Sequence, residues 1–219
     1  MSSTTTREMR PGTGPVVGAA QAVIDELTAQ SWRDAGVQPG MRVLTAGRGI
    51  GELSMLAAAT VGPKGSVVGV DSSTAAIRSA ALRTSMAGSS RLSYTRQELA
   101  RLELGAPVDA VLVRSALLRL DDPWAALRGV VPSVKPGGLI VVQELDDESS
   151  APIAETMFDR LRHGAARSPA ELRIAIQLSR IFRACGLPPR LTLGGDVASR
   201  HLREAAAQRP VFVSAATCV

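Results

Sequence analysis

The sequence of 219 residues is poor in aromatic side chains, which make up 3% of it. Its core must therefore be built from aliphatic side chains and alanine, and 45% of the residues are hydrophobic. Lysine is also scarce, since only Lys64 and Lys135 are lysines among 25 cationic residues. The net charge is +5, but the cations alternate with acids and form no dense basic run. The composition therefore gives no support for a nucleic-acid partner.

Cysteine and long apolar runs are scarce as well. Cys185 and Cys218 are the two cysteines, which are too few for a disulfide framework and lack the spacing of a metal site. No stretch has the roughly 18 consecutive apolar residues that a spanning helix needs, and the polar start lacks the apolar segment of a secretory signal. We therefore expect a cytoplasmic protein without a membrane partner. Residues 1–14 would form a flexible tail and residues 15–219 a single domain.

Apolar segments of strand length alternate with segments of helical period along the chain. Helices are predicted for residues 16–35, 51–59, 73–86, 122–134, 154–163, 170–185 and 199–207. Strands are predicted for residues 42–46, 66–70, 92–95, 110–113, 139–143, 190–193 and 211–216. The Pro-Gly-Gly of residues 136–138 predicts a tight turn before the fifth strand. This alternation predicts an α/β fold, with helices on both faces of a doubly wound, mostly parallel seven-stranded sheet.

The most informative stretch begins at Val43, where an apolar run predicts a buried strand. The strand leads into a loop with Gly47, Gly49 and Gly51, which a helical pattern and a second apolar strand follow. Glycines let a backbone approach a ligand closely, and N–H groups at a helix N-terminus favour an anionic group. The second strand ends at Asp71, whose carboxylate can accept hydrogen bonds from both hydroxyls of a ribose. The stretch therefore predicts the first half of a nucleotide-binding fold.

The Gly-x-Gly-x-Gly spacing, with Asp71 twenty residues beyond its last glycine, resembles the class I S-adenosylmethionine-dependent methyltransferases of the small-molecule type. The nearest resemblance is to ubiquinone/menaquinone-biosynthesis enzymes and natural-product methyltransferases. Later segments resemble the family in their order and spacing, at residues 108–113, 115–123, 134–138 and 181–187. The resemblance implies a Rossmann-like methyltransferase fold, S-adenosylmethionine as cofactor, and a small-molecule acceptor that is a secondary metabolite or quinone-like.

The resemblance also assigns residues to the cofactor. It implies that the methionine carboxylate lies near the glycine loop and that the adenosine ribose reaches Asp71. The cofactor-binding residues that we expect are Thr45, Gly47, Arg48, Gly49, Gly51, Asp71, Ser72, Gln97, Glu98, Arg114 and Ser115. No metal is expected, because the acidic run at residues 144–148 has no second ligand cluster and is typical of a charged loop.

Three of these positions depart from the family pattern. Thr45 stands where the first strand usually ends in an acid, so a negative charge near a cationic ligand is missing. Gln97 stands where an Asp commonly meets the adenine amino group, and its amide oxygen can accept the same hydrogen bond. Arg48 stands where a small residue or Cys is common, and it either pairs with the cofactor carboxylate or projects into solvent.

The sequence offers one candidate general base. Of its two histidines, His163 is the better placed, because it falls within residues 146–168, which we interpret as a lid over the acceptor. A surface histidine is the alternative. Thr45 and Gln97 also favour a second function, a cofactor-binding protein that does not transfer methyl, such as a cyclase or an inactive partner subunit. An RNA or protein methyltransferase is less favoured, because no Asn/Asp-Pro-Pro-aromatic motif follows the fourth strand. A homodimer is left open.

Overall fold

The computed structural model describes residues 25–26, 28–47, 49–86, 90–144, 169–193 and 211–217. The predicted helices at 154–163 and 199–207, the predicted tail at 1–14 and the predicted lid lie outside these residues. The helix predicted for 16–35 is described from residue 25 and ends at Ala35. No described helix has the length and apolar character that crossing a membrane requires.

Seven strands form one sheet in the order β3-β2-β1-β4-β5-β7-β6. They are β1 (Arg42–Gly47), β2 (Ser66–Asp71), β3 (Leu92–Arg96), β4 (Val108–Arg114), β5 (Val134–Glu144), β6 (Arg190–Leu193) and β7 (Val211–Thr217). The first five strands pair in parallel, and β7 pairs antiparallel with both β5 and β6. The predicted doubly wound, mostly parallel fold is therefore confirmed.

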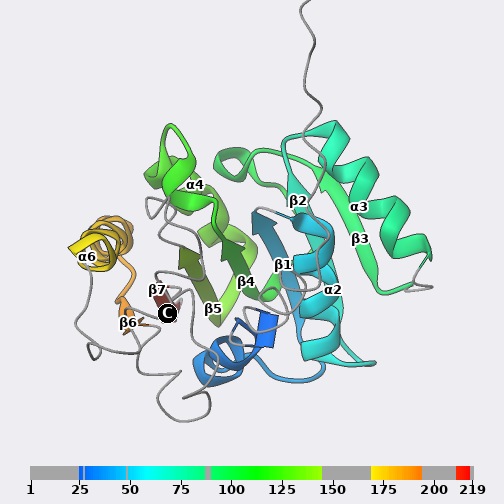
Figure 1. Ribbon diagram of the computed structural model, residues 1–219, viewed down its shortest axis with the longest axis horizontal. Helices are drawn as coiled ribbons and strands as arrows, with labels where there is room; N and C mark the ends of the chain where they lie inside the picture. The colour runs from blue at the N-terminus through cyan, green and yellow to red at the C-terminus, as the bar shows by residue number, and fades with distance from the viewer. Residues whose placement is uncertain are drawn as a thin grey trace, which may run out of the picture.

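The helices cover both faces of the sheet (Figure 1). Besides the N-terminal helix that ends at Ala35, they are α2 (Ile50–Val61), α3 (Thr74–Met86), α4 (Pro123–Val130) and α6 (Pro169–Ala184), with short 3₁₀ helices η1 (Leu99–Arg101), η2 (Leu117–Arg119) and η3 (Val131–Ser133). The core is split accordingly. Leu44 of β1 belongs to a cluster with α4 and α6, whereas its neighbour Val43 belongs to a cluster with Trp32 and α2. Strands buried on both faces explain why their sequences read as continuous apolar runs.

The Pro-Gly-Gly segment departs from its predicted role. Residues 136–138 lie inside β5, which begins at Val134, and do not form a turn ahead of the strand. The pairing with β4 shifts here, because Val108 pairs with Val134 but Ala110 pairs with Leu139. Residues 135–138 of β5 therefore lie opposite a single residue of β4, as an irregularity between two paired positions.

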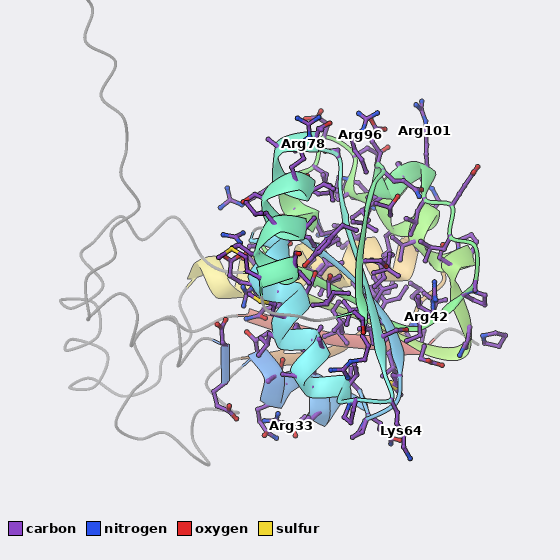
Figure 2. All side chains as sticks on the ribbon, turned by 90° about the vertical axis from the view of Figure 1, so that its right-hand side faces the viewer. Arg33, Arg42, Lys64, Arg78, Arg96 and Arg101 are labelled. Carbon is purple, nitrogen blue, oxygen red and sulfur yellow. The ribbon has the colours of Figure 1, made fainter. Side chains whose placement is uncertain are left out.

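Cationic side chains lie at both ends of the sheet. Figure 2 shows Arg78, Arg96 and Arg101 projecting from the end where β2 and β3 finish, and Arg33 and Lys64 at the opposite end. These five labelled side chains therefore lie at two ends and do not form one cluster.

Helix α4 begins as its sequence predicts, at Pro123 in the first turn, and Asp122 Oδ1 accepts the Ala125 N–H at 2.8 Å. The helix then packs on η1 through backbone contact at Gly129. A Cβ added to Gly129 would lie 2.3 Å from the Leu99 carbonyl oxygen and 2.6 Å from that of Ala100. Because Leu99 and Ala100 stand at the carboxyl end of the sheet, this contact sets the position of one wall of the site described below.

Gly129→Ala should lower the free energy of unfolding by about 1 to 3 kcal/mol, because the new methyl group must displace the η1 backbone. The loss should occur even though alanine is the better helix former. Gly105→Ala is the matched control, since an added Cβ there meets nothing within 4 Å, and its effect should stay within about 0.5 kcal/mol. Urea unfolding of both variants measures the difference. Equal stability of the two would refute the backbone contact.

Candidate functional site

A cavity of about 710 Å³ opens where β1, β2, β3 and β4 end at the carboxyl edge of the sheet. Strand order reverses at β1, between β2 and β4, and α/β sheets bind ligands at such a switch point. The cavity is lined by these residues of the predicted set: Gly47, Gly49, Asp71, Ser72, Gln97, Glu98 and Ser115. The fold thus brings together side chains from the ends of four strands that are separated in the sequence.

The glycine loop forms the floor of the cavity. Gly47 has φ 134°, and a Cβ added there would lie 2.0 Å from the Arg114 carbonyl oxygen, so the turn passes directly against the end of β4. Gly49 is left-handed with φ 70° and precedes α2, whose N-terminus has no side-chain cap. The uncapped N–H groups of α2 favour an anionic group at this point.

Three predicted residues do not line the cavity. Thr45 is fully buried on the α2 side, because alternation along β1 turns it that way, and its Oγ1 lies 2.7 Å from Ser54 Oγ. Gly51 lies against α3, where an added Cβ would be 3.2 Å from the Ala80 Cα, so its small size serves helix packing. Arg114 is buried and pairs with Asp25 at 2.9 Å. Arg48 and His163 lie outside the described residues.

Asp71 ends β2 at the cavity. Its Oδ1 accepts the Ser73 N–H at 2.7 Å, which fixes the carboxylate at the start of α3. Among the described residues, Oδ2 has no hydrogen-bond partner. One carboxylate oxygen therefore orients the group, and the other stands ready to accept a hydrogen bond from a ligand.

Gln97 lines the cavity, but its amide is committed to its own loop. Its Oε1 accepts the Glu103 N–H at 2.8 Å, and its Nε2 donates to the Glu103 carbonyl at 2.9 Å and to Thr95 Oγ1 at 3.3 Å. Only the second lone pair of the amide oxygen is left for a ligand. The side chain therefore shapes the loop after β3.

Apolar residues from η1 and α4 complete the cavity, and the sequence analysis missed them. Leu99 and Ala100 come from η1, and Ala125 and Ala126 come from α4. Together they form an apolar surface beside Asp71, of the kind on which a flat heterocycle packs. The available signal was weak, because the apolar pair of η1 stands in a polar stretch of the sequence and α4 reads as an ordinary amphipathic helix.

Ser115 combines two uncommon features. It is the one described non-glycine residue with positive φ, at 50°, a conformation that costs free energy. It is 7% exposed, and its Oγ has no hydrogen-bond partner among the described residues. An unpaired buried hydroxyl at a cavity wall is one that a bound ligand can satisfy.

Glu144 is buried next to this turn, at the end of β5. It is 3% exposed, and its Oε1 accepts the N–H groups of Ala116 at 3.3 Å and Leu118 at 3.2 Å. Burial raises the pKa of Glu144, although these backbone N–H bonds and the charge of Arg119 oppose the rise. The interpretation of Glu144 as part of a charged loop is therefore wrong, because it is the buried last residue of β5. No group of potential metal ligands occurs among the described residues.

Comparison with known proteins agrees with this geometry. The sequence model of a family described as "Methyltransferase domain" matches residues 37–177. No curated protein matches the chain.

Among solved structures, a SAM-dependent methyltransferase from Aquifex aeolicus is 18% identical, with a TM-score of 0.63 over 88% of this chain and 89% of that one. A putative sarcosine dimethylglycine methyltransferase from Galdieria sulphuraria is 14% identical, with a TM-score of 0.65 over 92% and 88%. The 4+2 cyclase SpnF is 21% identical, with a TM-score of 0.64 over 91% and 83%. At these identities the structures show a shared fold.

The buried Glu144 predicts a pH dependence of stability. Because its pKa is raised in the folded state, the unfolded chain releases this proton at lower pH than the folded protein does. The contribution of Glu144 to stability is therefore present at low pH and is lost as pH rises through the raised pKa. Glu144→Gln is neutral at every pH and keeps an acceptor oxygen. The free energy of unfolding of Glu144→Gln minus that of wild type should therefore increase as pH rises from the unfolded-state pKa to the raised pKa, and then level off. Urea unfolding at a series of pH values measures it, and a difference that stays flat would contradict the raised pKa.

Proposed function

Because the chain belongs to the methyltransferase-domain family, we propose that it binds S-adenosylmethionine in the cavity and transfers its methyl group to a small molecule. A secondary metabolite or a quinone-like compound is the acceptor class that the sequence resemblance favours. One observation carries the proposal: the glycine turn, Asp71 and Ser115, whose buried hydroxyl has no partner among the described residues, border the same cavity. Its volume of about 710 Å³ suits a small-molecule site.

The residues at the β2 and β3 ends fit a nucleoside. Asp71 would accept hydrogen bonds from the ribose hydroxyls through its unoccupied oxygen, while Ser73 holds the other. Leu99 and Ala100 would pack against the adenine ring, and the free lone pair of Gln97 would accept from its amino group. These contacts would give a partner to the free carboxylate oxygen of Asp71 and to the remaining lone pair of Gln97.

The residues at the β1 and β4 ends fit an amino-acid group. The uncapped N-terminus of α2 after Gly49 favours a carboxylate. Ser115 lines the cavity from the turn after β4, against which Gly47 packs. Thr45 contributes no charge here, because its hydroxyl is paired with Ser54 inside the core.

The bound cofactor supplies an activated methyl group on a sulfonium, so the protein has mainly to align the acceptor and exclude water. The described cavity lining holds no His, Cys, Lys or Tyr. Arg119, Leu120 and Asp121 line the cavity between η2 and α4, and the acceptor would lie beside them. We therefore propose that catalysis depends on positioning, with an acceptor that is already nucleophilic.

The same observation favours a second candidate function. A lining without a neutral-range base suits a protein that binds the cofactor and does not transfer methyl. Both functions require cofactor binding, which native mass spectrometry of the purified protein tests, because retained S-adenosylmethionine or S-adenosylhomocysteine identifies the ligand. Assays with phenolic, amine and quinol acceptors then separate the two functions. Tight cofactor binding without turnover on any acceptor would favour the second.

Asp71→Asn should weaken binding of S-adenosylhomocysteine by about 1.5 to 3 kcal/mol, because it removes charge-assisted hydrogen bonds to the ribose. This corresponds to roughly 10- to 150-fold in Kd. The asparagine oxygen can still accept the Ser73 N–H, so the turn into α3 should persist. Calorimetry measures Kd, and Asp34→Asn, on the described N-terminal helix and outside the cavity lining, is the control. An unchanged Kd for Asp71→Asn would remove Asp71 from the site.

His163→Ala should cost no more than about 100-fold in turnover if the acceptor is an amine or phenolate, because such an acceptor needs little help from a base. His201→Ala is the control and should have no effect. Turnover is measured across a pH series. A loss near 10,000-fold that higher pH restores would instead make His163 the essential base.

A further inference from the structure

The turn that connects β4 to η2 is fastened to the last two residues of β5. The Ser115 N–H donates to the Gln143 carbonyl at 2.8 Å, which continues the sheet pairing by one bond. The next two bonds are made by a side chain, because Glu144 Oε1 accepts from both Ala116 and Leu118. A single carboxylate oxygen therefore holds the N–H groups on either side of Leu117.

This fastening explains how Ser115 keeps its unfavourable backbone conformation. A serine at φ 50° relaxes to negative φ unless its neighbours fix it. Here the residue before it is the last residue of β4, and the residue after it is bound to Glu144. The conformation is thus imposed from both sides.

The imposed conformation fixes Ser115 in the cavity wall. Ser115 lines the cavity and is 7% exposed, and its Oγ is buried without a partner among the described residues. The preceding carbonyl, that of Arg114, is the atom against which Gly47 packs. Ser115 therefore stands beside the glycine turn, at the end of the cavity proposed above for the amino-acid group.

We propose that Glu144 is a positioning residue for the cofactor site, which holds the turn after β4 so that the Ser115 hydroxyl hydrogen-bonds to the amino-acid end of S-adenosylmethionine. The inference rests on the proposed function and adds a residue that does not itself line the cavity. A buried carboxyl is expensive compared with an apolar side chain of the same length. An apolar side chain could not accept hydrogen bonds from the two backbone N–H groups, as Glu144 does.

A double-mutant cycle tests the link between the two residues. Glu144→Met removes the acceptor oxygen and keeps an unbranched side chain of similar length, and Ser115→Ala removes the hydroxyl. Each change should raise the Kd for S-adenosylhomocysteine about tenfold, as expected for one lost hydrogen bond. If Glu144 acts through Ser115, the double variant should also lose about tenfold instead of a hundredfold. Additive losses would show that Glu144 stabilises the fold in general, and would overturn the inference.

Two further variants separate positioning from stability. Glu144→Gln should bind like wild type, because one amide oxygen can accept both N–H groups that now share Oε1. Asp109→Asn is the matched control, since Asp109 accepts the Arg42 N–H at 2.8 Å at the opposite end of β4. It should lower the unfolding temperature and leave Kd unchanged. A tenfold rise in Kd for Asp109→Asn would show that lost stability alone explains the effect of Glu144→Met, and would overturn the inference.

Wild-type protein gives a measurement that does not depend on the folding of a variant. The amide protons of Ala116 and Leu118 should exchange slowly in the free protein, because the turn is already held before ligand binds. Fast exchange of both would overturn the inference even if Glu144→Met fails to fold. No binding of S-adenosylhomocysteine by wild type would overturn the proposed function and this inference together. Wild-type affinity in Glu144→Met would overturn the inference alone.

Discussion

The close contact between Gly47 and the Arg114 carbonyl is the constraint on which the site depends. β1 and β4 pair up to these two residues, which are partners in the register of the sheet. With no side chain at Gly47, the chain can leave β1 directly over the end of β4 and enter α2 within three residues. Any larger residue would lift the turn from the sheet. The cavity floor, the start of α2 and the turn at Ser115 would then no longer face one another.

The two walls of the cavity are held in different ways. On the β2 and β3 side, hydrogen bonds within short loops set the shape, as in the closure of Gln97 on Glu103. On the β4 and β5 side, the wall is held by a contact across strands, from Glu144 to Ala116 and Leu118. The loop of the first wall is therefore closed by local bonds, although the contact with Gly129 also sets its Leu99 and Ala100, whereas the second wall forms only once β4 and β5 have paired.

This difference explains what the sequence could predict. The order of the described strands and helices, the glycine turn and the acid at the end of β2 follow from the apolar runs and from the glycines and prolines between them, and the described residues have all of these features. The side of β1 on which Thr45 lies was not predictable from period, because a strand buried on both faces shows no polar alternation. The pairing of Arg114 with Asp25 joins residues 89 positions apart. The burial of Glu144 was not predictable either, because the acidic residues that follow it make the segment resemble a charged loop.

The place of β7 in the sheet has a consequence for the order in which the chain assembles. β7 follows β6 in sequence, but it lies between β5 and β6 and pairs with both. β6 consequently has no neighbour in the sheet until the chain has reached Thr217. During synthesis from the N-terminus, β1 to β5 and the cavity at their ends can form first. The outer edge of the sheet can close only after that, once β7 is available to pair with both β5 and β6.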